Sequence, residues 1–248
     1  MPGTIYVLLT GLLCFIYITI VYLPVVFFLP ERKSVLLARK AIGIVGKGLV
    51  ASGAFKIRVT WKKEEEFQAL DPKEGIIFVS NHQSNLDIPI VYTALKGNFG
   101  FVAKKEMRRW PFYGIWMRKM KCVFLDRRNP REGLKDIKRA VEVVKEGYPM
   151  LIFPEGERSH DGGILPFKKG SFKLALDTRG IVVPVTIRGT FAVQKRGEWH
   201  IHRGKDVDVI IDEPIHVNRL DTEEMKTLDK RVREIIIRNF EAEGESLV

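Results

Sequence analysis

The sequence predicts an α/β fold, in which a mixed, largely parallel sheet is flanked by helices and preceded by an apolar helical segment. Three observations indicate it. The first 30 residues carry no charged side chain. From about residue 55, short β-branched and aromatic runs alternate with longer helical patterns, which is typical of a largely parallel sheet. The 248 residues, 46% of them hydrophobic, suffice for one sizeable core. We therefore expect a membrane-anchoring helical segment over residues 1–54 and one α/β domain over residues 55–248.

The N-terminal apolar run, residues 5–29, is long enough to cross a bilayer. As a helix rising about 1.5 Å per residue it would reach roughly 37 Å, against a hydrocarbon core of about 30 Å. A cleaved signal peptide is disfavoured because no basic residue precedes the run. Basic residues such as Arg32 and Arg39 follow it, which predicts that the rest of the chain lies on the cytoplasmic face of the membrane. The run either spans the bilayer or bends near Pro24 and returns with the amphipathic stretch 35–55 as a helical hairpin.

Strand-like and helix-like runs alternate through the remainder of the chain. The helix expected from Gly133 has the clearest pattern, because Leu134, Ile137, Val141 and Val144 recur every three or four residues and would face a core. The expected strands are 56–61, 76–80, 99–103, 122–125, 150–153, 182–188 and 207–211, and the expected helices are 88–95, 133–146, 171–177 and 223–240.

The charge balance indicates a polyanionic partner. The chain carries 41 Lys and Arg against 30 Asp and Glu, a formal net charge of +11. Charge alone does not distinguish nucleic acid, an acidic protein and an anionic membrane. The apolar N-terminal segment favours the lipid bilayer as the partner, and we expect no nucleic-acid ligand. A noncatalytic membrane-tethered module that binds nucleic acid or an acidic protein is the alternative that needs no catalytic motif.

The loop after the strand expected over 76–80 reads Asn-His-Gln-Ser-Asn-Leu-Asp at positions 81–87. In open α/β sheets, reactive groups gather where strands end. A histidine can accept a proton near neutral pH and a neighbouring carboxylate can orient its imidazole, so His82 and Asp87 are a candidate base and its partner. The same residues also fit an ordinary helix start, with Asp87 as a cap. No metal site is expected, because the other histidines lie far apart in the sequence or in plain strand patterns.

Three further segments could join His82 at one edge of the sheet. Residues 124–128, Phe-Leu-Asp-Arg-Arg, end one strand with paired guanidinium groups, which can hold a phosphate. Residues 153–159, Phe-Pro-Glu-Gly-Glu-Arg-Ser, end the next strand with a turn and another arginine. Residues 183–185, Val-Pro-Val, interrupt a later strand with a proline. Each also has an ordinary explanation, as a surface ion pair, a turn or an edge-strand proline.

These four segments, in this order, resemble the motifs of the glycerolipid acyltransferases, and most closely those of the 1-acylglycerol-3-phosphate (lysophosphatidate) acyltransferases. The resemblance covers roughly residues 55–215. It implies that His82 is the general base and Asp87 its partner. Two positions depart from the family pattern: Glu157 stands where the third motif more often has threonine, and Cys122 where a glycine commonly precedes the second motif. The substrate-binding residues that the resemblance implies are Lys105, Arg127, Glu155, Gly156 and Arg158.

The resemblance also implies a reaction. His82 would deprotonate the free hydroxyl of lysophosphatidate as it attacks an acyl thioester, giving phosphatidate without an acyl-enzyme. The acyl donor would be acyl-CoA or acyl-carrier protein, and no cofactor is expected. An acidic carrier protein is a candidate partner because basic helix faces could steer it. The donors for the tetrahedral oxyanion are expected among the backbone N–H groups of residues 81–87 or around Gly156.

Two alternatives remain open at this point. The acceptor could be glycerol 3-phosphate or another lysophospholipid. A membrane-tethered lipid hydrolase, a different class of enzyme, would use Ser84 or Ser159 as a nucleophile beside His82 and Asp87, although the chain lacks the Gly-x-Ser-x-Gly motif of such enzymes.

Overall fold

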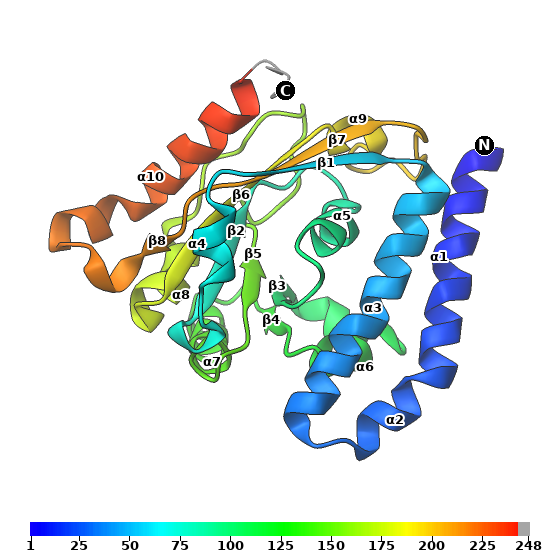
Figure 1. Ribbon diagram of the computed structural model, residues 1–248, viewed down its shortest axis with the longest axis horizontal. Coiled ribbons are helices and arrows are strands. Elements are labelled where there is room, and N and C mark those ends of the chain that lie inside the picture. Colours follow the sequence, from blue (N-terminus) through cyan, green and yellow to red (C-terminus); the bar gives the residue numbers. More distant parts are fainter. Residues whose placement is uncertain (243–248) are drawn as a thin grey trace.

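A mixed eight-stranded sheet forms the centre of the protein (Figure 1). The structure, a computed structural model, describes residues 1–242. The strand order is β1-β7-β6-β2-β5-β3-β4, with β8 paired to β6. Strands β6, β2, β5, β3 and β4 are parallel, β7 and β8 run antiparallel to β6, and β1 is parallel to β7. The predicted fold class is confirmed. The strands are β1 (Lys56–Trp61), β2 (Ile76–Ser80), β3 (Gly100–Lys104), β4 (Val123–Leu125), β5 (Met150–Ile152), β6 (Ile181–Arg188), β7 (Asp206–Ile211) and β8 (Ile215–His216).

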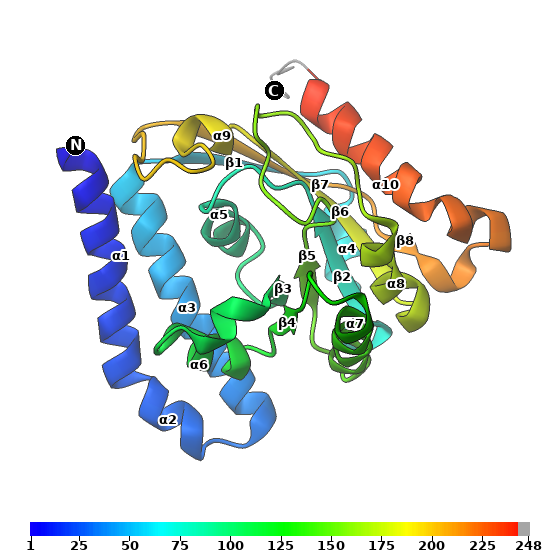
Figure 2. The same cartoon turned by 180° about the vertical axis from the view of Figure 1, so that it is seen from behind.

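Helices cover both faces of the sheet and enclose two apolar cores (Figures 1 and 2). One core lies under the helices α1, α3, α5 and α6, and the other lies under α7, α8 and α10. The central strands β2 and β6 read as nearly continuous apolar runs because both of their faces are buried. The helices are α1 (Pro2–Val21), α2 (Leu23–Phe28), α3 (Glu31–Gly53), α4 (Glu64–Gln68), α5 (Asp87–Ala94), α6 (Tyr113–Lys119), α7 (Pro130–Lys145), α8 (Lys169–Thr178), α9 (Thr190–Val193) and α10 (Thr222–Glu241), with short 3-10 helices η1 (Pro72–Glu74), η2 (Lys105–Arg109) and η3 (Val217–Arg219).

The predicted strands agree with the observed ones to within one residue at each end, while the predicted helices differ more. Helix α7 begins three residues before the predicted start, because the Asn129 side chain accepts the backbone N–H groups of Arg131 and Glu132 and Pro130 occupies the first turn. The short elements α4, α6, α9 and β8 were not predicted, since none is long enough to show a clear period.

The N-terminal segment forms a helical hairpin, which is one of the two arrangements expected. Helix α1 ends just before Pro24, α2 continues for six residues, and α3 runs back beside α1 (Figures 1 and 2). Small residues allow the two long helices to approach closely: a Cβ atom at Gly11 would lie 2.6 Å from the Leu49 side chain. Helix α1 is long and apolar enough to cross a membrane by length and composition.

Arg39 in α3 is buried, not part of a basic surface flank as the sequence suggested. Its side chain is 1% exposed, and its guanidinium donates to the backbone carbonyls of Asn98, Met120 and Pro149 at 3.2–3.4 Å. Each of these carbonyls lies just before one of the parallel strands β3, β4 and β5. The rigid fork of five N–H donors suits this arrangement. Arg39 therefore ties α3 to the edge of the sheet where the parallel strands begin.

Pro184 does not interrupt its strand, contrary to the expectation of an edge-strand break. Strand β6 is continuous and lies inside the sheet, with Pro184 opposite Val79 of β2. On its other side β6 pairs with β8 at residues 181–182 and with β7 at residues 185–188. Pro184 sits in the gap between these two partners, so its missing N–H breaks no ladder bond on that side.

Candidate active site

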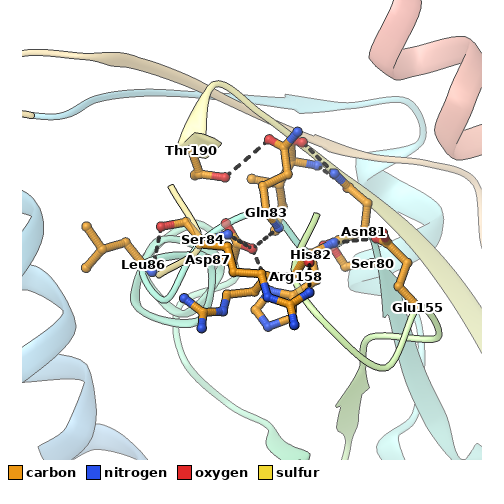
Figure 3. A network of polar contacts seen from close by, with 12 residues as sticks. Ser80, Asn81, His82, Gln83, Ser84, Leu86, Asp87, Glu155, Arg158 and Thr190 are labelled. Atoms are coloured by element: carbon orange, nitrogen blue, oxygen red, sulfur yellow. Dashed lines mark hydrogen bonds and ion pairs between the residues drawn. The ribbon is translucent and has the colours of Figure 1, made fainter. Parts of the chain in front are cut away.

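The loop that carries His82 leaves strand β2 at the edge where the parallel strands end (Figure 3). Asn81, the first residue of the loop, is fully buried. Its amide group donates to the carbonyl of Ile187 and accepts the N–H of the same residue, both at 2.8 Å. The side chain thereby continues the β2–β6 pairing by one step. This bridge fixes the start of the loop, and sequence reasoning assigned no role to Asn81.

His82 and Asp87 are in direct contact. The Nδ1 atom of His82 lies 2.7 Å from Oδ2 of Asp87, which also accepts the backbone N–H groups of Gln83 at 2.6 Å and Ser84 at 2.8 Å. Asp87 is completely buried, whereas the His82 side chain is 19% exposed. A carboxylate can only accept, so we assign the proton of the neutral imidazole to Nδ1. That leaves the lone pair of Nε2 free to take up a proton. Asp87 is also the first residue of α5, but it is not the cap that the sequence suggested: Leu86 precedes the helix without a side-chain cap, and Oδ2 of Asp87 accepts N–H groups of the preceding loop instead.

The segment 153–159 holds His82 from the other side. The ring of Phe153 stacks on the imidazole, with centroids 4.1 Å apart and planes inclined by 17°. The N–H of His82 donates to Oε1 of Glu155 at 2.6 Å, and the carbonyl of His82 accepts the N–H of Ser159 at 2.8 Å. Ring and backbone of His82 are therefore both positioned by the loop that follows β5.

Glu155 is buried and both of its carboxylate oxygens are engaged. Its side chain is 2% exposed, and the second oxygen accepts the N–H of Leu165 at 2.8 Å. Burial raises the pKa of Glu155 to about 7, against the opposing effect of these two backbone hydrogen bonds. The carboxylate thus joins the loop of His82 to the chain near residue 165.

The basic residues expected at the site fall into two groups. Arg158 lies beside His82 and Asp87 in Figure 3, and Arg127 donates to the carbonyl of Gly156. Lys105 instead pairs with Asp126 at 2.8 Å, and this pairing, with two backbone hydrogen bonds, holds the pKa of Asp126 at about 2. Lys105 lines a pocket of about 750 Å³ together with Glu106, Arg108, Arg109, Arg118, Asp126 and Arg128, which neither Arg127 nor Arg158 lines.

Several of the expected oxyanion donors are already engaged. The N–H groups of His82, Gln83 and Ser84 donate to Glu155 and Asp87, and that of Gly156 donates to the carbonyl of Phe153. These four groups are therefore not free to stabilise an oxyanion. Glu157, which departs from the family pattern, pairs with Arg196 at 2.8 Å. Within residues 1–242 no three His, Cys, Asp or Glu side chains cluster in a way that could hold a metal ion.

The model of the family described as Acyltransferase matches residues 58–188, more than half of the chain. The chain belongs to the acyltransferase family. Within this acyltransferase, the matched segment includes the loops that hold His82, Arg127 and Arg158, and it ends with strand β6.

Named relatives of this acyltransferase include plant and bacterial proteins. The 1-acyl-sn-glycerol-3-phosphate acyltransferase BAT2 of Brassica napus, a chloroplastic protein, is 42% identical over 147 residues, which cover 58% of this chain and 42% of that protein. The 1-acyl-sn-glycerol-3-phosphate acyltransferase of Limnanthes douglasii is 32% identical over 177 residues, covering 71% and 62% respectively. The alignments thus span less than two thirds of these plant relatives.

A solved structure resembles almost the whole acyltransferase. The crystal structure of the 1-acyl-sn-glycerophosphate (LPA) acyltransferase from Thermotoga maritima matches with a TM-score of 0.75 and 30% identity, covering 96% of this chain and 95% of that one. The likeness therefore extends over the N-terminal hairpin as well as the sheet.

Proposed function

We propose that this acyltransferase is a 1-acylglycerol-3-phosphate O-acyltransferase, which transfers a fatty acyl chain from an acyl thioester to the free hydroxyl of lysophosphatidate and forms phosphatidate. The observation that carries the proposal is the buried Asp87 carboxylate bonded to Nδ1 of His82, which leaves Nε2 able to act as a base. The names of the relatives from Brassica napus and Thermotoga maritima support the choice of lysophosphatidate as acceptor.

In the proposed mechanism, Nε2 of His82 takes the proton of the acceptor hydroxyl while the oxygen attacks the thioester carbonyl. The C–O bond forms, the tetrahedral intermediate collapses with cleavage of the C–S bond, and His82 returns the proton to the departing thiolate. Asp87 keeps the imidazole in the required tautomer and stabilises its protonated form. Phe153 and Glu155 hold the ring and backbone of His82 in place. No acyl-enzyme forms, because the substrate supplies the nucleophile.

The geometry of the two candidate serines argues against a hydrolase. Ser84 and Ser159 are fully buried. The Ser84 hydroxyl accepts the N–H of Leu86, while the Ser159 hydroxyl bonds Asp161 and accepts the N–H of Gly162. Both hydroxyl groups therefore make their hydrogen bonds within their own loops.

For the acceptor headgroup we assign Arg158 and Arg127 as the phosphate-binding arginines, Gly156 as the turn of the Arg158 loop that Arg127 contacts, and Lys105 as a further cationic contact. Arg158 lies next to the proposed base (Figure 3), and Arg127 orders the turn through the carbonyl of Gly156. Glu155 shapes the site through the backbone of His82. Glycerol 3-phosphate and other lysophospholipids share parts of this headgroup and are the competing acceptors.

The membrane is the proposed location. Helix α1 turns a row of apolar side chains outward, and Phe28 at the end of α2 is 89% exposed. Because α3 packs against the sheet domain through Arg39, α1 runs along the flank of the domain and not away from it (Figure 1). We therefore assign residues 1–54 to an anchor that enters the bilayer surface as a hairpin, and residues 55–248 to a catalytic domain on the cytoplasmic face.

The test is a product assay with the full chain purified in detergent. Lysophosphatidate is mixed with acyl-CoA or with acyl-carrier protein that bears a fatty acyl thioester, and the lipid products are identified by mass spectrometry. We expect phosphatidate, with whichever donor supports turnover, and little product from glycerol 3-phosphate or lysophosphatidylcholine. His82→Ala should lower turnover about 10²- to 10⁴-fold, while His216→Ala in strand β8 serves as the matched control. Release of free fatty acid without acylated lipid would contradict the proposal and favour a hydrolase.

A further inference from the structure

The segment between β3 and α6 presents aromatic and basic side chains to solvent at the same edge of the sheet as His82. Residues 108–113, Arg-Arg-Trp-Pro-Phe-Tyr, are all exposed, and we call this segment the aromatic tip. Trp110 is 54% exposed and Phe112 is 55% exposed. Exposed apolar patches of this kind, rimmed by polar residues, commonly mark interaction surfaces.

The aromatic tip is a folded element and not a loose loop. The N–H of Trp110 donates to the carbonyl of Met107, and the N–H of Gly114 donates to the carbonyl of Trp110. A Cβ atom at Gly114 would lie 2.3 Å from the Arg108 carbonyl, so the close turn requires glycine. Phe112 has a φ of +55°, which a bulky residue rarely adopts, and yet its ring faces solvent. The N–H of Tyr113 donates to the carbonyl of Pro111 across this turn, so the backbone holds the Phe112 side chain at the exposed point of the turn.

The aromatic tip is continuous with the exposed apolar face of the N-terminal hairpin. The ring of Tyr113 lies 5.3 Å from that of Phe15 in α1, and the Lys119 ammonium lies 4.1 Å above the ring of Phe27 in α2. The indole N–H of Trp116 donates to the Thr19 hydroxyl of α1 at 3.0 Å. Figure 2 shows α6 beside the hairpin. Tyr113 of the tip and the following helix α6 therefore pack directly against α1 and α2, whose outer sides are apolar and exposed.

The charges beside the aromatic tip complement an anionic membrane. The pocket beside the aromatic tip is lined by five basic residues, Lys105 and four arginines, and by two acidic ones, Glu106 and Asp126. Tryptophan and tyrosine concentrate at the water interface of bilayers, and basic residues near an anionic lipid surface add attraction. An acidic protein would be met by the same charges but would not explain why the aromatic rings continue the apolar face of the hairpin.

We propose that the aromatic tip is a second bilayer contact, which inserts Trp110 and Phe112 into the interface and binds anionic phospholipid headgroups through Arg108 and Arg109. This inference rests on the membrane location proposed above. The aromatic tip and the N-terminal hairpin would then be two points of attachment to the membrane. Attachment through the tip would turn the pocket beside Lys105 toward the lipid surface.

The experiment measures binding of the full chain to vesicles of phosphatidylcholine with and without phosphatidylglycerol. The double change Trp110→Ser and Phe112→Ser should lower partitioning onto both kinds of vesicle roughly tenfold. The double change Arg108→Gln and Arg109→Gln should lower partitioning roughly tenfold on the anionic vesicles and have little effect on the neutral ones. Leu134→Ser is the matched control: Leu134, which the sequence pattern placed in the core, is exposed on α7, and α7 packs on the other core.

A second readout locates the indole directly. The contribution of Trp110 is the difference in fluorescence between the wild type and Trp110→Phe. Vesicles with bromine on the acyl chains should quench this contribution. Absence of that quenching, or wild-type partitioning of the aromatic variant, would overturn the proposal, and so would a variant whose binding to acyl-carrier protein fell while its vesicle binding did not. Acyl transfer in detergent micelles should be unchanged in all of these variants. If the wild-type protein itself produced no phosphatidate there, the proposed reaction would fail independently of the membrane contact.

Discussion

Replacing Asp87 with asparagine separates the charge of the buried carboxylate from its shape. In the structure Oδ2 accepts three N–H groups, from the imidazole of His82 and from the backbone of Gln83 and Ser84. The amide oxygen of asparagine can accept the same three bonds, so the loop keeps its geometry and His82 keeps its tautomer. What Asp87→Asn removes is the negative charge that faces the imidazolium formed during the reaction.

The size of the effect follows from the contact distance and the burial. Two unit charges about 4 Å apart interact by about 4 kcal/mol at an effective dielectric constant of about 20. That energy corresponds to a factor of about 10³ in rate. We therefore expect kcat to fall about 10³-fold with little change in either KM. Stability should fall by about 1–3 kcal/mol as well, because Oδ1 of Asp87 is a buried atom with no hydrogen-bond partner in residues 1–242, and an NH₂ group there would be unsatisfied.

The assay follows phosphatidate formation from labelled acyl donor, with urea unfolding as the control for stability. The double variant His82→Ala with Asp87→Asn should lose no more activity than His82→Ala alone, because Asp87 acts through His82. A double variant that loses a further factor of about 10³, or an Asp87→Asn protein with near-normal kcat, would refute the assigned relation between the two residues.

Four further expectations concern Glu155, the two arginines assigned to the headgroup, and Arg39. Glu155→Gln leaves the backbone N–H of His82 or that of Leu165 without an acceptor. It should lower kcat roughly tenfold and leave both KM values nearly unchanged. The pKa of Glu155 rises from 4.5 to about 7 on folding, so the folded state binds more protons between these pH values and the free energy of unfolding should decrease as pH rises from 4.5 to 7. When urea unfolding is repeated across this pH range, the free energy of unfolding of Glu155→Gln should depend less steeply on pH than that of the wild type. Arg127→Ala and Arg158→Ala should each raise the KM for lysophosphatidate roughly tenfold and leave the KM for the thioester unchanged, with exposed Arg131→Ala on α7 as control; equal effects on both substrates would contradict a headgroup role. Arg39→Met should lower the free energy of unfolding by about 1–3 kcal/mol with unchanged KM values, since the carbonyls of Asn98, Met120 and Pro149 lose the guanidinium donor and only that of Pro149 keeps a second one, the N–H of Gly100; a variant as stable as wild type would show that the link is dispensable.

The sheet could be predicted from the sequence because its strands are apolar runs bounded by turns, and the loops at their ends drew attention to His82, Asp87 and Arg158. The resemblance added roles but no geometry. Asn81 and Phe153 show why: their contacts with Ile187 and with the imidazole join segments far apart in the chain. Such contacts depend on strand order, which local patterns do not specify. The short helix α6 escaped prediction for the related reason that seven residues show too few turns for a period.

The position of Arg39 has a consequence for how the protein meets its lipid substrate. The anchor is joined to the starts of three strands, and the same strands run from that edge toward the loops of the active site. The hairpin is thus held in a fixed orientation relative to the sheet, and a rotation of the hairpin alone would break the hydrogen bonds of Arg39. In the proposed membrane location, the height of His82 above the acyl chains is then set by the fold itself.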